Sequence, residues 1–481
     1  MEEKALPLSA HVHNQVRSPM LVTALVAGAI FMELMDGTVI ATALPQMAIS
    51  FHVGVVSMNI GMTAYLLTLA VFIPVSGWIA DRLGTRSTFI SAIAIFTVAS
   101  MLCGISHGLY EFTAMRVLQG IGGAMMVPVG RLVVLRVTPK EKLTEALVWI
   151  TWPGMLALVL GPPLGGLITT YASWPWIFFL NLPLGLLGMV FGWRWIANAR
   201  ETTHVAFDWP TFLLAALAST ALVYAMELLG ADLQHWRVSL LLLLLSFLSG
   251  WIAIQTARSR PRTALIDLKS MQDQTYAQSV YGGTAYRAAV SVLPFLLPLM
   301  FQVAFKLTAF RSGLYVLALF AGDLSMKAFV KPVLQRWGFR QVLLVNGVFT
   351  AAALALCAIL TSATPVFLLL AVLFVHGAGR SMEFTAIGTL AYAAIPEERL
   401  SRANGFLSSV MQLGMGLGVP VGAVCLRWMA HLHGNTTGSP SLRDFHGAIL
   451  VAAVLALGPV LNAWHLPADA GSIASGHRIL P

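Results

Sequence analysis

Between two long apolar runs lies a short charged stretch, Gly77-Trp78-Ile79-Ala80-Asp81-Arg82-Leu83-Gly84-Thr85-Arg86. It returns in altered form later in the chain as Gln335-Arg336-Trp337-Gly338-Phe339-Arg340. A second pair of similar stretches, 138–146 and 395–403, recurs at nearly the same offset. Two echoes in the same order indicate an internal duplication. Many membrane transporters consist of two such related halves around a central substrate path.

The composition excludes a soluble fold. Charged residues make up 10% of the 481 residues and hydrophobic residues 58%, against about 25% and 45–50% in soluble domains. The net charge of +9 does not indicate nucleic-acid binding, because the basic residues fall in short loops between apolar runs rather than in one patch. Cys103, Cys357 and Cys425 each lie inside an apolar run without CxxC spacing, so neither a disulfide framework nor a metal site is expected.

A membrane-spanning helix needs about 20 mostly apolar residues, and the sequence contains fourteen candidates. Helices are expected because backbone groups in a bilayer must be hydrogen-bonded internally. The first six spans cover roughly 20–44, 55–79, 87–106, 112–137, 144–171 and 174–197. Two more cover roughly 209–229 and 237–257. The last six cover roughly 275–304, 310–330, 340–361, 366–393, 402–430 and 445–466.

The echoes align the first six spans with the last six. They predict an all-α membrane protein of two six-helix bundles related by pseudo-two-fold symmetry, with two extra central helices between them. The expected divisions are a tail (1–19), a first bundle (20–200), two inserted helices (201–258), a basic linker (259–274), a second bundle (275–466) and a C-terminal tail (467–481).

The basic residues set the orientation. With fourteen spans, the loops of one side carry Arg82, Arg86, Lys140, Lys142, Arg200, Arg258, Arg260, Arg262, Lys269, Lys331, Arg336, Arg340, Arg399 and Arg402. The opposite loops carry only Arg237, Lys306, Arg311 and Arg443, with Arg427 near a span end. Cations in short loops mark the cytoplasmic face, so both termini are expected in the cytoplasm. Glu33 and Asp36 make the first apolar run a poor signal peptide, and we expect it to be retained.

Two carboxylates lie in the first span, the second of them in the stretch Met35-Asp36-Gly37-Thr38-Val39-Ile40-Ala41-Thr42-Ala43-Leu44-Pro45. A carboxylate inside a span is costly and is usually retained for function. Desolvation favours its protonated form, which is what a proton carrier requires. Glu33 and Asp36 are spaced i, i+3 and share one helix face. The alternative is that one of them caps or pairs with a neighbouring helix.

The stretch at 77–86 combines glycines with charge. Gly77 and Gly84 permit a tight turn and close helix approach. Asp81, at a helix end, can bind a neighbouring helix terminus or a basic residue in one conformation and release it in another. Topogenic charge alone would explain Arg82 and Arg86 but neither Asp81 nor the glycine spacing.

A lone guanidinium lies in the fourth span, within Arg116-Val117-Leu118-Gln119-Gly120-Ile121-Gly122-Gly123-Ala124. It needs an acceptor, and Asp36 or Glu33 is the candidate. A cation that holds a carboxylate ionised in one state and releases it in the next would couple proton uptake to shape. A permanent ion pair is the structural alternative.

The fifth span contains Gly154 and the run Gly161-Pro162-Pro163-Leu164-Gly165-Gly166. Proline removes a backbone donor and kinks a helix, while glycines let an adjoining helix come close.

Together these four stretches resemble motifs of the major facilitator superfamily, in its fourteen-span drug:proton antiporter branch of the EmrB/QacA kind. They are similar to LDxTVxNxALP (with Ala41 for Asn), GxxxDRxGxR (with Thr85 for Arg), RxxQGxGxA and the GPxxGG core of the antiporter motif (with Ala157 for an upstream Gly). The resemblance implies proton-coupling residues Asp36, Glu33 and Arg116. It implies a conformational latch of Gly77, Asp81, Arg82, Gly84 and Arg86. It also implies an antiporter motif of Gly154, Gly161, Pro162, Gly165 and Gly166, and exchange rather than co-transport.

Further intramembrane polar residues lie outside these motifs. Asp323 and Lys327 are spaced i, i+4, and Arg380 and Glu383 i, i+3, so each pair is expected to neutralise itself along one helix. Lining of a cavity is the alternative for these residues. Other candidates for cavity lining are Gln119, Met125, Met126 and Arg287, where the methionines would serve equally as plain packing. Glu227 and Arg287 have no local partner. The pair His431 and His433 lacks a third ligand, so no metal site is expected.

The leading hypothesis is a proton-driven antiporter that exports amphipathic small molecules, as in multidrug efflux, by alternating access. It would use the transmembrane proton gradient and no cofactor. The same fold exporting a metabolite, organic acid or metal complex is the alternative, and a non-transporting membrane sensor is a remote one. No P-loop, HExxH or GxSxG pattern indicates an enzyme.

The expected partners are a small-molecule substrate, protons and the lipid bilayer, and no nucleic acid. We expect a multi-pass monomer in the bacterial cytoplasmic (inner) membrane. The resemblance also permits a periplasmic adaptor and an outer-membrane channel.

Overall fold

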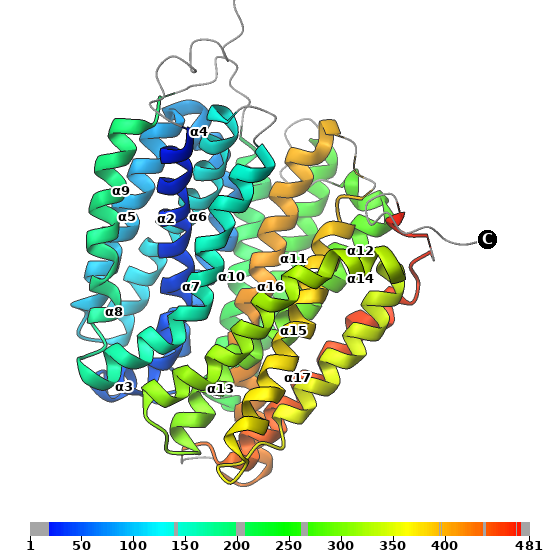
Figure 1. Cartoon of the computed structure of the whole chain (residues 1–481). Helices are drawn as coiled ribbons and strands as arrows, with labels where there is room; N and C mark the ends of the chain where they lie inside the picture. Colours follow the sequence, from blue (N-terminus) through cyan, green and yellow to red (C-terminus); the bar gives the residue numbers. More distant parts are fainter. Residues whose placement is uncertain are drawn as a thin grey trace, which may run out of the picture.

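The computed structural model describes residues 19–138, 143–198, 207–260, 268–393, 395, 397–435, 439–467 and 469–472, and this part of the chain is all-helical. The first half contains α2 (Pro19–Val39), η1 (Ile40–Thr42), α3 (Leu44–Ser50), α4 (Asn59–Leu83), α5 (Thr85–Gly104), α6 (Leu109–Val137), α7 (Leu143–Tyr171), α8 (Trp176–Phe179) and α9 (Asn181–Trp195). Between the two halves of the sequence come α10 (Trp209–Ala231), η3 (Leu233–His235) and α11 (Trp236–Ser259). The second half contains η4 (Ser270–Gln272), α12 (Gln274–Val290), α13 (Val292–Val303), α14 (Ala309–Cys357), α15 (Val366–Leu390), α16 (Glu397–Leu432) and α17 (Leu442–Ala463). Figure 1 shows the long helices running roughly side by side.

Twelve helical segments of the described chain are long and apolar enough to cross a membrane. One of them, α14, has 49 residues and bends at Gly338, whose φ of 69° is not helical. The predicted spans 310–330 and 340–361 lie on either side of this bend. The predicted last span corresponds to α17, which is not among the twelve. The count of fourteen therefore stays a prediction that depends on α14 acting as two spans and on α17.

The duplication predicted from the sequence recurs in the helix contacts. Gly84 and Gly338, which occupy equivalent places in the two echoes, both have positive φ, at 91° and 69°. A Cβ on Gly120 of α6 would lie 2.9 Å from the Tyr65 carbonyl oxygen of α4. The equivalent contact in the second half joins Gly377 of α15 to the Leu319 carbonyl of α14. The two halves therefore repeat the same close helix packing.

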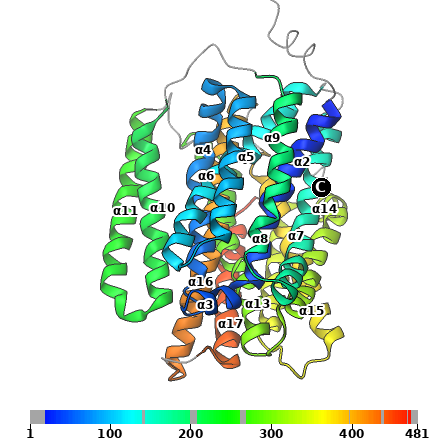
Figure 2. The same ribbon diagram turned by 90° about the vertical axis from the view of Figure 1, so that its left-hand side faces the viewer.

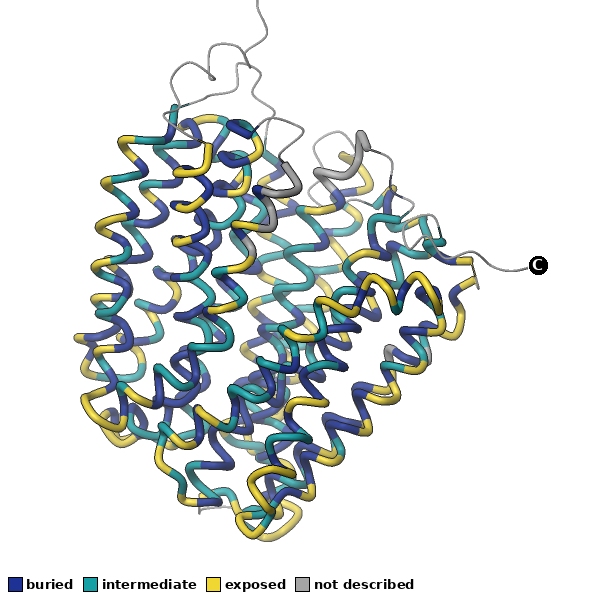
Figure 3. Tube along the Cα trace, viewed as in Figure 1, coloured by how far each residue is buried: buried dark blue, intermediate teal, exposed yellow. Residues whose placement is uncertain are grey.

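Burial separates central from peripheral helices. In the central segment Gln274–Val303, 72% of the most apolar window is buried, whereas in Leu233–Ser259 only 17% is buried. Figure 3 shows exposed residues along the outer faces and the helix ends. An apolar helix that is exposed all round fits a lipid environment, because lipid tails are as apolar as its side chains.

Two hydrogen bonds between described residues join the halves at one end of the molecule. The Phe310 backbone N–H at the start of α14 donates to Thr170 Oγ1 at the end of α7, at 3.1 Å. Gln302 Nε2 at the end of α13 donates to the Thr42 carbonyl after α2, at 3.2 Å. These contacts lie at the lower end in Figure 1, which the predicted orientation places outside the cell.

The inserted pair lies at the side of the molecule. In the described chain α10 contacts α4 and α16, whereas α11 contacts α10 and η3. Figure 2 shows α10 and α11 together at the left-hand edge, outside the two bundles.

Candidate functional site

A buried ion pair between α2 and α6 forms the centre of the site. Arg116 Nη1 lies 2.5 Å from Asp36 Oδ2, and the two side chains are 1% and 0% exposed. Asp36 belongs to the core of the first bundle, on the face of α2 that packs against other helices. Of the two predicted acceptors for Arg116, the structure therefore selects Asp36.

Neutral amides complete the shell of Asp36. Its Oδ1 accepts hydrogen bonds from Gln119 Nε2 at 2.8 Å and from Asn181 Nδ2 at 3.0 Å. Asn181, at the start of α9, also donates to Ser100 Oγ of α5 at 2.9 Å. Both carboxylate oxygens thus have donors, which come from α6 and α9, as a buried charge requires.

The guanidinium of Arg116 is held from α4 as well. Its Nε donates to the Gly61 carbonyl at 3.3 Å, and its carbon atom lies 4.1 Å from the centre of the Tyr65 ring. Gln119 Oε1 accepts a further bond from Arg116 Nη1 at 2.6 Å. Because Gly120 allows α4 to come close to α6, Arg116 of α6 can contact α4 as well as Asp36 of α2.

Glu33 lies one turn before Asp36 on α2 and is half-buried. Its Oε2 has no hydrogen-bond partner among the described residues. Arg131 of α6 attracts it electrostatically, and Asp36 repels it. The two carboxylates therefore differ in their surroundings, since Asp36 is saturated with donors and Glu33 is not.

In the 77–86 stretch, Asp81 Oδ1 lies 3.9 Å from Arg136 Nη2 at the end of α6. This is a partly exposed pair between helix ends, as predicted for a latch, although that role stays a prediction. Gly84 ends α4 with φ 91°, and a Cβ there would clash with the side chain of Asn198. The expectation of a close helix approach at Gly77 is wrong, because a Cβ there would meet no atom within 4 Å.

The remaining charges of that stretch lie over aromatic rings. Arg82 lies 4.5 Å from the centre of the Trp78 ring, and Arg86 lies 4.8 Å from that of Trp193. Such cation–π contacts hold the basic side chains at the surface of the bundle.

The glycines of the fifth span face α2. A Cβ on Gly154 would lie 2.7 Å from Ile30, and Cβ atoms on Gly161 and Gly165 would clash with Thr38 and Val39. Gly166, which follows Pro162 and Gly165, faces Ala309 of the other half in the same way. The predicted close approach of an adjoining helix is therefore present, on two sides of α7.

In the second half, the predicted pairing along single helices is wrong. Arg380 of α15 pairs with Asp323 of α14, with Nη2 and Oδ2 2.5 Å apart. Lys327 donates to Thr385 Oγ1 at 2.9 Å, and Glu383 Oε2 accepts from Asn346 Nδ2 at 2.7 Å. Contacts between α14 and α15 thus replace the i, i+4 and i, i+3 contacts, because the two helices pack closely at Gly377.

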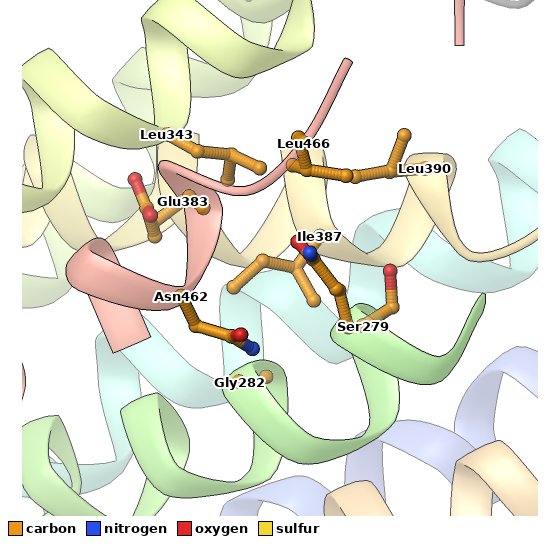
Figure 4. A pocket seen from close by; sticks show the side chains of 11 residues that line it. Ser279, Gly282, Leu343, Glu383, Ile387, Leu390, Asn462 and Leu466 are labelled. Atoms are coloured by element: carbon orange, nitrogen blue, oxygen red, sulfur yellow. The ribbon is translucent and has the colours of Figure 1, made fainter. Parts of the chain in front are cut away.

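Glu383 also borders a small pocket of about 20 Å³. In Figure 4, Glu383, Asn462 and Ser279 stand around it, on three helices from different parts of the chain. A space of that size holds about one water molecule.

Arg287 of α12 is buried without an anionic partner among the described residues. It is 9% exposed, its Nε has no hydrogen-bond partner there, and its guanidinium carbon lies 4.2 Å from the centre of the Phe384 ring. Lys327 lies within electrostatic range of Arg287. Arg287 and Lys327 are therefore two intramembrane cations of the second half that no described carboxylate contacts directly.

The other candidate residues lie in the hydrophobic core or contact neighbouring polar side chains. Met125 and Met126 are buried in the hydrophobic core of the first half, which agrees with the alternative that they serve as packing residues. Gln119 belongs to the network around Asp36, as described above. Glu227 of α10 faces Thr63 of α4. His433 Nδ1 lies 2.7 Å from Asp444 Oδ1, at the turn between α16 and α17.

Sequence reasoning missed Asn181, Ser100 and Tyr65. Asn181 had a detectable signal, since an amide within an apolar run needs a hydrogen-bond partner inside the membrane. Ser100 and Tyr65 gave none, because both residue types are common in spans.

The family model described as Major Facilitator Superfamily matches residues 26–262 and 280–474. "Putative multidrug resistance protein MdtD" of Serratia proteamaculans is 36% identical over 449 residues, which cover 92% of this chain and 93% of that protein. The protein of the same name from Citrobacter koseri is 35% identical over 450 residues, covering 92% and 94%.

A crystal structure of a D-xylose-proton symporter superposes with a TM-score of 0.65. It covers 94% of this chain and 99% of that chain at 12% sequence identity, so this likeness concerns the fold alone.

Proposed function

The chain belongs to the major facilitator superfamily, and from this premise we propose that it exports amphipathic small molecules in exchange for protons. It is a secondary transporter with multiple membrane-spanning helices and not an enzyme. The multidrug resistance named for its relatives supports efflux as the direction. The energy would come from the transmembrane proton gradient, without a cofactor.

The observation that carries the proposal is the buried pair of Asp36 and Arg116. A carboxylate with three donors in a dry bundle is stable as an anion only while its cation remains in contact. Protonation of Asp36 would cancel the attraction and leave Arg116 to find other acceptors. Because Arg116 is also bonded to α4 through Gly61, this change would act on the packing of α2, α4 and α6 together.

Glu33 supports a route for the proton. It lies one turn nearer the predicted cytoplasmic end of α2, is less buried than Asp36, and has an oxygen without a described partner. In the proposal Glu33 exchanges protons with water and Asp36 in turn. The bond between Asp36 and Arg116 then changes with the access state.

The bacterial organisms of the relatives support a bacterial cytoplasmic membrane, and the positive-inside pattern supports both termini in the cytoplasm. In that orientation the described contacts between halves close the outer end, as in an inward-facing state. We propose a monomer, since both halves lie in one chain. A periplasmic adaptor and an outer-membrane channel are further partners that the resemblance permits.

The test is drug-dependent proton movement in proteoliposomes. Asp36→Asn is expected to abolish it, because an amide cannot take up and release the proton. Asp323→Asn is the matched control, since Asp323 is an acid with the same 2.5 Å contact to an arginine in the other half. It should retain exchange per folded molecule. Undiminished exchange in Asp36→Asn would remove Asp36 from the coupling role.

Export of an organic anion is the second candidate, and Arg287 is the observation that favours it. A buried guanidinium without an anion is costly unless a ligand supplies one. The separating experiment is an accumulation screen in a pump-deficient host with anionic and cationic compounds of similar size. Arg287→Gln should weaken export of anions only. Equal loss for both classes would contradict this candidate.

A further inference from the structure

A large cavity separates the inserted pair from the body of the protein. It has a volume of about 1310 Å³ and lies between α10 and α11 on one side and α4, α12 and α16 on the other. No residue of the Asp36 network lines it. The cavity is thus distinct from the proposed coupling site.

The cavity follows from how the inserted pair is attached. Near the end of α10, a Cβ on Gly230 would lie 2.9 Å from Ala423 of α16, so the helices touch there. Towards the start of α10, small residues such as Ala215, Ala216 and Ala218 face the cavity. The helices therefore meet at one end and leave a gap at the other, which is the end predicted to be cytoplasmic.

Most of the lining residues lie towards the end of their span that is cytoplasmic in the predicted orientation. They include the last two turns of α11, where Ala253, Ala257 and Arg258 face the cavity. On α16 they lie between Phe406 and Leu417, well before the helix ends at Leu432. The cavity therefore faces one leaflet of the membrane.

The charges on the lining have one sign. Arg258 ends α11 and Lys269 precedes η4, so both lie at the same end of the cavity. Both side chains are exposed, neither forms an ion pair with a described residue, and none of the described Asp or Glu residues lines the cavity. This end attracts an anion at the membrane surface.

The shape and the charge together define the ligand. The volume exceeds the roughly 300–1,000 Å³ of small-molecule pockets. A free inorganic anion would not use the apolar walls, and a neutral lipid would not use the cations. Basic pockets between transmembrane helices on the cytoplasmic side bind acidic lipid headgroups. We propose that the cavity binds an anionic phospholipid, with its headgroup at Arg258 and Lys269 and its acyl chains between the inserted pair and α12 and α16.

The test is retention of lipid by the full-length protein, measured by native mass spectrometry. Detergent-purified protein is mixed with phosphatidylglycerol or phosphatidylcholine. The wild type should retain phosphatidylglycerol about 25-fold better, since each surface cation contributes roughly fivefold. The variant Arg258→Gln/Lys269→Gln should retain both lipids equally. Arg260→Gln is the matched control, because this neighbouring cation does not line the cavity, and it should keep the preference.

A second variant tests the apolar part. Ala253→Trp fills the cavity from α11 and should reduce retention of both lipids. Equal retention of the two lipids by the wild type, or an equal loss of preference in Arg260→Gln, would overturn the proposal. So would unchanged retention in Ala253→Trp. The experiment measures no transport, so its outcome is independent of whether the protein exchanges drugs for protons.

Discussion

Two buried arginine–aspartate pairs have the same contact distance but different surroundings. Asp36 is fully buried and accepts two further amide hydrogen bonds. The Asp323 side chain is 16% exposed and has Lys327 within electrostatic range. Removal of one partner leaves an isolated buried charge, and its cost rises with the degree of desolvation. The pair of Asp36 and Arg116 should therefore be the less tolerant of the two.

This difference predicts the effect of replacing each arginine. Arg116→Gln should destabilise the folded protein by about 3–5 kcal/mol, because Asp36 is left as an unpaired buried anion. Arg380→Gln should cost less, since Asp323 keeps water and Lys327 nearby. The measurement is the thermal unfolding of detergent-solubilised protein. The double variant Asp36→Asn/Arg116→Gln should recover most of the loss, and failure to recover it would assign the effect to lost packing instead.

For single residues, the sequence shows which buried groups require a partner better than it shows which residue that partner is. Arg116 had to have an acceptor, and the two carboxylates of the first span were the candidates. The partners of the neutral members of the network were not predictable, because an amide or hydroxyl can bond to many groups. The predicted partner of Asp323, Lys327, was wrong, since neighbours along one helix can be read from spacing whereas a contact between helices, such as that with Arg380, depends on packing.

Among the helices, α2 and α7 illustrate packing by small residues. Their contact runs along Gly154, Gly161 and Gly165, where α7 has no side chain of its own and atoms of α2 occupy the space. In a bilayer such contacts depend on van der Waals packing rather than on a hydrophobic gain, so lost closeness is not compensated. The sequence predicted this strip from its glycine spacing. The same argument failed at Gly77, because glycine alone does not show which face of a helix meets a neighbour.

The contrast gives a test with a matched glycine. Gly165→Ala should destabilise the protein by about 1–3 kcal/mol, because the new methyl group overpacks the interface against Val39. Gly77→Ala should be neutral or slightly stabilising, since its Cβ meets open space and alanine favours helix. Thermal unfolding of the two variants in one detergent decides the matter. Equal effects in the two variants would show that the close contact of Gly165 with α2 does not decide the stability.

Across the whole molecule, the duplicated sequence predicted the two-bundle architecture but not which end is closed. Transport by alternating access uses the same helices in both states, so spans and motifs are common to both. The closed end becomes visible only in contacts such as that between Phe310 and Thr170. The inserted pair was also predicted as helices. The cavity between this pair and the rest of the protein was not predictable, because it depends on the angle at which α10 packs against α16.

The contact at the closed end predicts that exchange requires the halves to separate there. In a background without Cys103, Cys357 and Cys425, Thr170→Cys/Phe310→Cys should form a disulfide on mild oxidation, because these positions adjoin across the halves. The oxidised protein should lose drug-dependent proton exchange, and reduction should restore it. The controls are the single variants Thr170→Cys and Phe310→Cys in the same background, neither of which can form the intramolecular disulfide. Oxidation of either single variant should leave exchange intact, because no separation of the halves is blocked. If the oxidised Thr170→Cys/Phe310→Cys protein exchanged at the full rate, the outer end would not have to open and the rocking of two halves would have to be abandoned.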